Sequence, residues 1–274
     1  MELKLKKISI ITVNLNNVLG LKRTISSVVE QPRENLEFII IDGASTDGSV
    51  DLIKEYADKI DYWVSEADTG TYAAMNKGIK KATGEYCLFL NSGDWLVSKN
   101  VVMDILGELT TGHDIYYSNM LVSDGKKHHE LRYPEAVDVN HFISSTISHQ
   151  NSLIRSEFLK KNGLYREDFK IAADWFFYLN AIYLKGARFR FIKTHIAYYY
   201  YMGMSNSPKY DLIKEKEHET GIREIFGDLA PSILELRAFQ QSVYGNIVGL
   251  FGVPKVLLFI LRTYRYLAKR FRSA

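Results

Sequence analysis

The stretch NSGD, residues 91–94, interrupts an apolar run that begins at Tyr86 and resumes at Trp95. Asn, Ser, Gly and Asp are ordinary turn residues, so a turn alone would explain the stretch. Carboxylate and amide oxygens are also the hard ligands that Mg²⁺ and Mn²⁺ take, often together with nucleotide phosphates. The stretch therefore predicts either a turn or a cation site, with Asp94 as the carboxylate ligand and Asn91 beside it.

A second carboxylate, Asp42, ends the apolar run LEFIIID at residues 36–42. A carboxylate in this position can accept a hydrogen bond from a uracil N–H or from a ribose hydroxyl. The alternative is that Asp42 caps its own loop. No G-x-G-x-x-G pattern follows the first apolar run, ISIITVN, so the dinucleotide fingerprint of NAD enzymes is missing.

Asp68 lies in a loop before a predicted helix that carries Lys77. One interpretation is structural, with Asp68 and Thr69 as turn and N-cap residues. The other is that the loop covers a nucleotide and that Lys77 or the helix N-terminus lies near phosphate.

The elements that must position these residues alternate along the first hundred residues. Apolar runs typical of buried strands are separated by amphipathic helical patterns, which indicates a parallel sheet covered on both faces. Ligands of such sheets bind beyond the carboxyl ends of the strands. Asn14, Asp42 and residues 91–94 all follow such ends, so we expect them to converge. The predicted strands are residues 8–14, 36–42, 60–66 and 85–90.

The rest of the chain has a mixed pattern. Residues 114–122 and 126–133 are expected to be strands that meet at the turn SDG, and residues 189–201 are strand-like. Helical patterns begin near Ser156 and Asp174 and cover residues 209–226 and 230–250. The only plausible domain boundary lies at residues 205–208.

The composition fits one domain with an extension. The 274 residues are 46% hydrophobic and 24% charged, an ordinary globular balance. The single cysteine, Cys87, excludes a disulfide within the chain and suits a reducing compartment. The N-terminus is basic and then apolar, but the apolar part is short and lacks a cleavage site, so it predicts a strand and not a signal peptide.

The residues after Glu235 differ from the rest of the chain in their charge. After Glu235 the chain carries seven positive and no negative charges, whereas its total formal charge is +3. On a helix, most apolar residues from Lys255 to Arg272 fall on one face and the basic residues on the other. Residues 253–274 therefore predict a basic amphipathic helix on an anionic membrane surface. Packing on the catalytic domain or in a homodimer is the alternative, and the negative remainder of the chain disfavours nucleic acid.

Four motifs in order resemble the family 2 glycosyltransferases of the GT-A fold: SIITVNLNN, IIIDGASTDGS, EADTGTYAAMNKGIKKATGEYCLFLNSGDWL and HQNSLIRSEFLKKNGLYREDFKIAADWFFYLNA. The resemblance covers roughly residues 7–205. It implies an α/β fold with a mostly parallel central sheet flanked by helices and a C-terminal helical extension. Residues 1–205 would form the catalytic domain, with a nucleotide-sugar half (1–110) and an acceptor half (111–205), and residues 206–274 the extension.

The resemblance also implies roles for single residues. Asp174 matches the family's general base, and the NSGD stretch takes the place of its D-x-D motif, leaving Asp94 for Mg²⁺ or Mn²⁺. The implied nucleotide-binding residues are Thr12, Asn14, Asp42, Asp68, Lys77 and Asn91. Residues implied near the acceptor or the diphosphate are His149, Gln150 and Ser205.

Two departures from the family pattern matter. Asn91 replaces the first Asp of the metal motif, and Ala173 replaces the acidic neighbour of the base. Asp174 also has a structural alternative, because Asp before an apolar helix is a common N-cap.

The sequence thus predicts an inverting glycosyltransferase that moves a sugar from a nucleotide sugar, UDP-linked, to a saccharide or lipid-linked acceptor in surface-polysaccharide synthesis. We expect it to be cytoplasmic and peripheral on the inner face of the membrane. The alternatives are an inactive nucleotide-sugar-binding partner of another transferase and a nucleotidyltransferase.

Overall fold

The computed structural model describes residues 7–110, 112–201 and 207–242. The chain divides into two compact units, residues 1–221 and 222–274. The first unit therefore continues past the predicted boundary at residues 205–208 and includes much of the helix predicted at residues 209–226.

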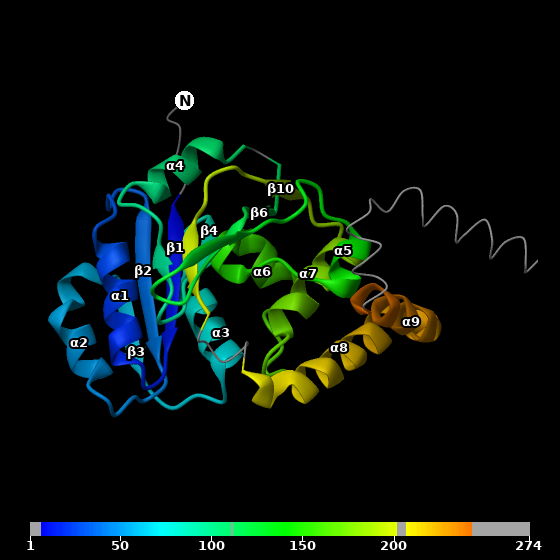
Figure 1. The fold of residues 1–274 in the computed structure, drawn as a ribbon. Coiled ribbons are helices and arrows are strands. Elements are labelled where there is room, and N and C mark those ends of the chain that lie inside the picture. The colour runs from blue at the N-terminus through cyan, green and yellow to red at the C-terminus, as the bar shows by residue number, and fades with distance from the viewer. Residues whose placement is uncertain (1–6, 111, 202–206, 243–274) are drawn as a thin grey trace, which may run out of the picture. The chain divides into compact units, whose positions relative to one another are not determined.

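A central sheet of seven strands has the order β10-β6-β9-β4-β1-β2-β3 (Figure 1). All neighbouring strands are parallel except the two pairs made by β9, which is antiparallel to β4 and β6. This confirms the predicted mostly parallel sheet. The strands are β1 (Ile8–Asn14), β2 (Leu36–Asp42), β3 (Tyr62–Ser65), β4 (Tyr86–Phe89), β6 (Ile115–Tyr117), β9 (Ser152–Arg155) and β10 (Phe189–Phe191).

Helices cover both faces of this sheet. On one face, Leu21 of α1 (Val18–Val29) and Ile105 of α4 (Val101–Glu108) join a buried cluster with Ile10 and Phe38. On the other, α3 (Thr71–Lys81) packs so closely that a Cβ at Gly78 would lie 2.4 Å from the Ile11 side chain. The remaining helices are α2 (Ser49–Glu55), α5 (Val139–Ser144), α6 (Ser156–Asn162), α7 (Ala173–Tyr183), α8 (Asp211–Phe226) and α9 (Ala230–Gln241), with 3-10 turns at Ala57–Lys59, His149–Asn151, Pro208–Tyr210 and Gly227–Leu229.

A second sheet has the order β5-β11-β7-β8. Its strands are β5 (Trp95–Leu96), β11 (Ala197–Tyr200), β7 (Met120–Ser123) and β8 (His128–Leu131). The expected hairpin at SDG is present, since Ser123 pairs with His128. Contrary to the prediction, residues 114–122 and 189–201 do not each form a single strand. Each of these segments contributes one strand to the central sheet and one strand to the second sheet. Pairing ends where the chain crosses over, and there the N–H of Ser118 bonds the Asn151 carbonyl instead of a strand.

Helix α2 has Gly48, in the left-handed region (φ 95°), at its N-cap position. Asp47 also contributes, because its Oδ1 accepts the Ser49 N–H at 3.0 Å. Helix α9 ends at Gln241, and the predicted continuation to residue 250 lies largely outside the described residues.

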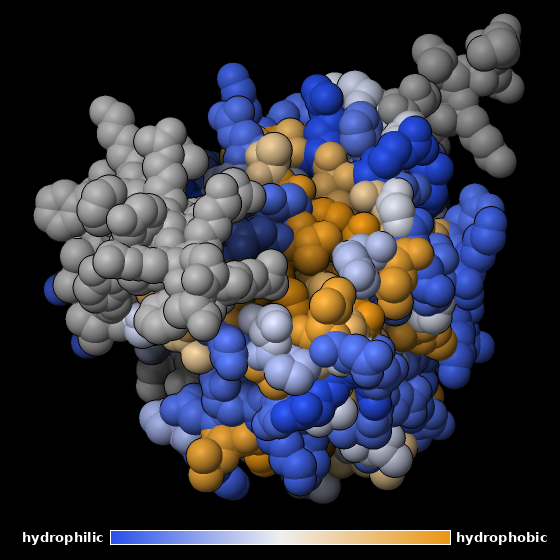
Figure 2. All heavy atoms as spheres, turned by 90° about the vertical axis from the view of Figure 1, so that its right-hand side faces the viewer, coloured by the Kyte–Doolittle hydropathy of each residue, from blue (hydrophilic) through white to orange (hydrophobic). Residues whose placement is uncertain are grey.

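On the face shown in Figure 2, apolar side chains gather near the middle and hydrophilic ones lie around them. Among the described residues, no helix has the length and apolar character needed to cross a membrane.

Candidate active site

The first three strands end in line at one edge of the sheet, where Asn14 pairs with Asp42 and Asp42 with Ser65. The Asp42 carboxylate is fully buried there. It accepts hydrogen bonds from Asn14 Nδ2 (2.7 Å), Ser65 Oγ (2.7 Å), and the N–H (2.9 Å) and Oγ (2.6 Å) of Ser45. The predicted convergence of polar residues at this edge is therefore observed.

These bonds also set the charge of Asp42. Burial alone would raise the pKa of its carboxyl, but the hydrogen bonds from Ser45, Ser65 and Asn14 hold it below the ordinary value. Asp42 is thus ionised, and its hydrogen bonds hold the loop that follows β2. Asn14 has one more polar atom, Oδ1, which is buried and has no protein partner, so it can accept a ligand N–H.

The loop after β1 connects this edge to the NSGD stretch. Asn17, the N-cap residue of α1, donates from Nδ2 to the Ser92 carbonyl at 3.0 Å. Thr24 of α1 donates to the Asp94 carbonyl at 2.7 Å and accepts the Gly93 N–H at 3.0 Å. The NSGD stretch is consequently held by α1 and is not a free turn.

Asp94 is buried, with 4% of its surface exposed. Within the part of the chain that the structure describes, its carboxylate accepts hydrogen bonds from the Tyr200 N–H at 2.8 Å and from Gln150 Nε2 at 3.1 Å. Burial outweighs these bonds and raises the pKa of Asp94 to about 6. Asp94 is therefore an incompletely compensated carboxylate, and a nearby cation would stabilise its charged form.

The dipeptide His149-Gln150 joins Asp94 to Asp174. Gln150 contacts Asp94, while His149 Nδ1 lies 2.9 Å from Asp174 Oδ2. The other ring nitrogen of His149, Nε2, lies 3.1 Å from Asn91 Nδ2. With this amide donating to Nε2, Nδ1 carries the hydrogen and donates to Asp174. The metal-motif stretch and the predicted base thus share one hydrogen-bond network.

Asp174 is the second residue of α7, and the N-cap position belongs to Ala172, so the N-cap interpretation of Asp174 is wrong. Its Oδ1 accepts the Trp175 N–H at 2.9 Å and lies 3.0 Å from the Tyr72 hydroxyl. Burial would raise the pKa of Asp174, but hydrogen bonds from His149, Trp175 and Tyr72 hold it below its usual range. The carboxylate is ionised at neutral pH, as a general base must be.

Other predicted residues have protein partners. Thr12 is buried and its hydroxyl donates to the Leu90 carbonyl at 2.8 Å. Lys77 forms an ion pair with Glu66 at 2.8 Å, so it ties the loop before α3 to the helix. Asp68 accepts the Gly70 N–H at 2.9 Å, and a Cβ on Gly43 would lie 3.0 Å from it, which places Asp68 beside the Asp42 loop. Ser205 lies outside the described residues.

Sequence reasoning missed four residues that complete the arrangement. Ser45 and Ser65 donate hydrogen bonds to Asp42. Asn17 holds the NSGD stretch, and Tyr72 contacts Asp174. Ser65 carried a usable signal, because it is the penultimate residue of the strand predicted at residues 60–66. Tyr72 carried none, since the contact joins residues 102 positions apart.

The side chains of this site could hold a divalent cation only if a bound nucleotide supplied further oxygen ligands. Within the described residues, no group of three or more His, Cys, Asp or Glu side chains could hold a metal ion. The available oxygens are the Asp94 carboxylate and Asn91 Oδ1, which is buried without a protein partner. One carboxylate and one amide oxygen suit Mg²⁺ or Mn²⁺ when phosphates supply further ligands.

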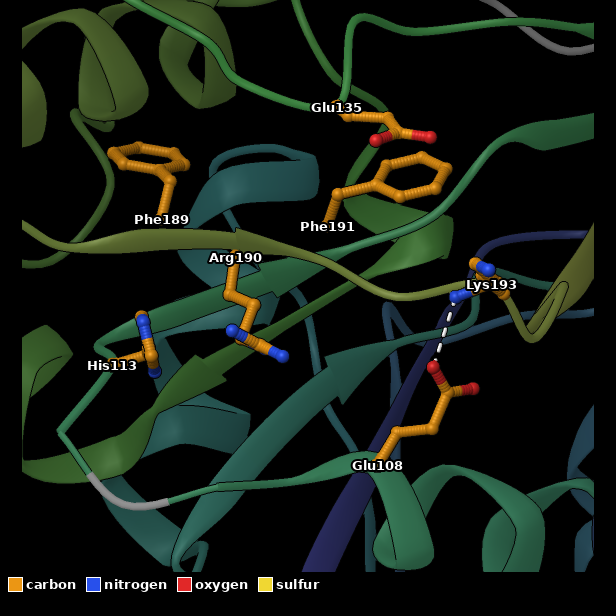
Figure 3. A pocket seen from close by; sticks show the side chains of 7 residues that line it. All are labelled: Glu108, His113, Glu135, Phe189, Arg190, Phe191 and Lys193. Atoms are coloured by element: carbon orange, nitrogen blue, oxygen red, sulfur yellow. Dashed lines mark hydrogen bonds between the residues drawn. The ribbon is translucent and has the colours of Figure 1, made fainter.

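A separate cavity of ≈ 380 Å³ lies beside β10 and α4 (Figure 3). Figure 3 shows Arg190 pointing away from Phe189 and Phe191, and Glu108 accepting the Lys193 N–H at 2.9 Å. No predicted site residue lines this cavity. The candidate active site is therefore assigned to the carboxyl edge of the sheet.

Comparison with known proteins identifies the family of the chain. The model of the family described as glycosyl transferase family 2 matches residues 9–206. The uncharacterized glycosyltransferase Rv1514c of Mycobacterium tuberculosis is 34% identical over 182 residues, which cover 64% of this chain and 68% of that protein. The poly(ribitol-phosphate) β-N-acetylglucosaminyltransferase TarS of Staphylococcus aureus is 28% identical over 205 residues, but the match spans only 35% of its length.

Solved structures share the fold. TarS 1–349 in complex with UDP-GlcNAc has a TM-score of 0.67 at 20% identity, covering 86% of this chain and 73% of that one. The mannosyltransferase PcManGT of Pyrobaculum calidifontis, in complex with GDP-Man and Mn²⁺, has a TM-score of 0.64 at 15% identity, covering 98% and 82%.

The Asp94–Gln150 contact gives a prediction about stability. The pKa of Asp94 is raised to about 6, so its burial costs stability above that pH, and Gln150 reduces the cost by donating to the ionised form. Gln150→Leu should lower the free energy of unfolding by about 1–3 kcal/mol at pH 7.5. At pH 5, where Asp94 is mostly protonated, the loss should be smaller. Urea unfolding with EDTA present measures both, and an equal loss at both pH values would contradict the assignment.

Proposed function

Because the chain belongs to glycosyl transferase family 2, we propose that it transfers a sugar from a UDP-linked donor to a hydroxyl group of a saccharide or lipid-linked saccharide, with inversion. The observation that carries this proposal is Asp174, an ionised carboxylate linked through His149 to the NSGD stretch. Membership of this family favours sugar transfer over nucleotidyl transfer.

The proposed reaction is a direct displacement. The acceptor oxygen attacks the anomeric carbon, the bond from that carbon to the diphosphate oxygen breaks, and UDP leaves with the electron pair. Asp174 takes the proton of the acceptor hydroxyl, which such a displacement requires. Hydrogen bonds from His149, Tyr72 and the Trp175 N–H orient the carboxylate before the acceptor arrives.

We assign the nucleoside to the ends of β1 and β2, where Asn14 Oδ1 has no protein partner and Asp42 holds the loop. Asp94 and Asn91 would hold Mg²⁺ or Mn²⁺ with the diphosphate. A bound cation would neutralise charge that develops on the leaving diphosphate.

Two kinds of relative support the donor and acceptor classes. The structural neighbour TarS 1–349 was solved with UDP-GlcNAc, and the sequence relative TarS acts on poly(ribitol-phosphate). Other relatives are named for PGL/p-HBAD biosynthesis. These names support a UDP-sugar donor and an acceptor in cell-surface glycan synthesis.

The second candidate is an inactive nucleotide-sugar-binding partner of another transferase. Asn91 and Ala173, which replace acidic residues of the family pattern, favour it. Turnover by the purified chain separates the two, since a binding partner would bind UDP but would neither transfer nor hydrolyse the sugar.

A membrane location is part of the proposal. Residues 253–274 combine basic and apolar faces on one predicted helix, which suits an anionic membrane surface at which a lipid-linked acceptor is available. This segment lies outside the described residues.

The first prediction concerns Asp94. Asp94→Asn keeps the shape of the side chain but removes the charge, so Mn²⁺ should no longer enhance UDP binding. A loss of about 10- to 100-fold in UDP affinity with Mn²⁺ corresponds to one charge-assisted interaction. Uridine, which has no phosphate, should bind as before. Calorimetric titrations with UDP and uridine, with and without Mn²⁺, measure this, and metal-independent UDP binding by the wild type would remove the cation role of Asp94.

The second prediction concerns Asp174. Asp174→Asn cannot accept a proton at neutral pH, so sugar transfer or donor hydrolysis should fall by about 10²–10⁴-fold. UDP affinity should stay unchanged. Asp168→Asn is the control, because Asp168 is an exposed carboxylate of the preceding loop, paired with Arg166. Near-normal turnover in a folded Asp174→Asn protein would show that Asp174 is not the base.

The third prediction concerns the tail. Deleting residues 253–274 should release the protein from anionic vesicles, while UDP affinity remains. Flotation with phosphatidylserine-containing vesicles and calorimetry with UDP measure the two properties. The membrane proposal is wrong if the truncated protein floats with the vesicles, or if the full-length protein does not.

A further inference from the structure

Three consecutive backbone N–H groups before α7 converge on one carboxylate. The N–H of Lys170 lies 2.6 Å from Glu217 Oε1, and those of Ile171 and Ala172 lie 3.0 and 2.9 Å from Oε2. Successive N–H groups of this kind form an anion-binding concavity. Here the anion is a side chain of α8, and Glu217 is buried with 8% of its surface exposed.

Helix α7 needs such a partner, because its N-cap residue, Ala172, offers no side-chain hydrogen bond. Unpaired N–H groups at the start of a helix are stabilised by a negative charge. Of the three N–H groups that Glu217 accepts, that of Ala172 belongs to the start of α7 and those of Lys170 and Ile171 to the loop before it, so Glu217 ties this loop to the start of the helix.

The same segment is held from its other side by Tyr72. The single hydrogen of the Tyr72 hydroxyl is shared between the Ile171 carbonyl at 2.7 Å and Asp174 Oδ1 at 3.0 Å. Glu217 holds the N–H of Ile171 and Tyr72 holds its carbonyl. Because both contacts are made at Ile171, a shift of residues 170–172 would move both Tyr72 and the carboxylate of Asp174.

Helix α8 is fixed against the first turn of α7. The ring of His218 packs edge-on against Trp175 with centroids 4.3 Å apart. A Cβ on Gly221 would lie 2.8 Å from the side chains of Trp175 and Phe176. The Trp175 indole in turn donates to the Phe142 carbonyl at 2.6 Å. Glu217 is thus a fixed support, since its helix has little freedom to follow a moving loop.

We infer that Glu217 is a positioning residue for the proposed base. The inference rests on the proposed function for its kinetic consequence. Without the Glu217 carboxylate, three N–H groups lose their partner, residues 170–172 relax, and Asp174 is no longer held against its acceptor. Nucleotide binding, which uses the ends of β1 and β2, should not change.

Kinetics of Glu217→Ala and Glu217→Gln test this inference. A displacement of about 1 Å can lower turnover by on the order of 10²-fold, so kcat of Glu217→Ala should fall about 10- to 100-fold. Glu217→Gln retains one acceptor oxygen and should lose less. The affinity for UDP should be unaltered in both. Glu215→Gln is the matched control, because Glu215 is an exposed carboxylate on the same helix, and its kcat should equal that of the wild type.

Amide hydrogen exchange provides a measurement that needs no turnover. In Glu217→Ala, exchange should accelerate at Ile171 and Ala172 and also at Trp175, whose N–H bonds Asp174. Exchange in β1 and β2 should stay as in the wild type. If those strands also exchange faster, the Ala variant has lost its fold and Glu217→Gln replaces it.

The outcomes are distinct. Wild-type kcat in a folded Glu217→Ala protein overturns the inference, as does unchanged exchange at Trp175. Absence of turnover in the wild type would overturn the proposed function. In that case, amide hydrogen exchange at Trp175 would be the one measurement of whether Glu217 positions the first turn of α7, which carries Asp174.

Discussion

A carboxylate can be buried only where donors or cations replace the water that it loses, and this constraint organises the carboxyl edge of the sheet. Asp42, Asp94 and Asp174 are brought there by three different segments, and each needs partners from others. The bonds that satisfy them connect β1, β2, β3, the NSGD stretch and α7. The site is therefore rigid because its charges are buried, which is the condition for preorganised catalysis.

The degree of compensation separates the roles of these carboxylates. Asp42 has four donors and a lowered pKa, so its own protein environment already satisfies its charge. The hydrogen bonds that Asp94 accepts from Tyr200 and Gln150 do not offset its burial, and its pKa is raised to about 6. Of the two, Asp94 would gain more from a cation, whereas Asp42 holds the loop that follows β2. Sequence position alone did not distinguish them, because both follow buried strands.

Local patterns predicted much of the fold. The predicted bounds of β1 and β2 agree with the structure, because apolar residues fill both faces of these strands between clear polar ends. The prediction of one strand each for residues 114–122 and 189–201 was wrong, because an apolar run does not show where a chain leaves one sheet for another. Convergence of Asn14 and Asp42 follows from parallel pairing, so it was predictable. The contacts of Tyr72 with Asp174 and of Glu217 with Ala172 depend on helix packing, which no local pattern encodes.

The two departures from the family pattern are consistent with a complete site. Asn91 has a donor as well as an acceptor: Nδ2 faces His149 Nε2, and Oδ1 remains without a partner. An aspartate at position 91 would offer only acceptors, so it could pair with Nε2 only if that nitrogen carried a hydrogen. Ala173 is fully buried, so an acidic side chain in this place would add another charge to be compensated. With an amide at position 91, one tautomer of His149 can accept from Asn91 and donate to Asp174, and with alanine at position 173 no second charge is buried beside Asp174.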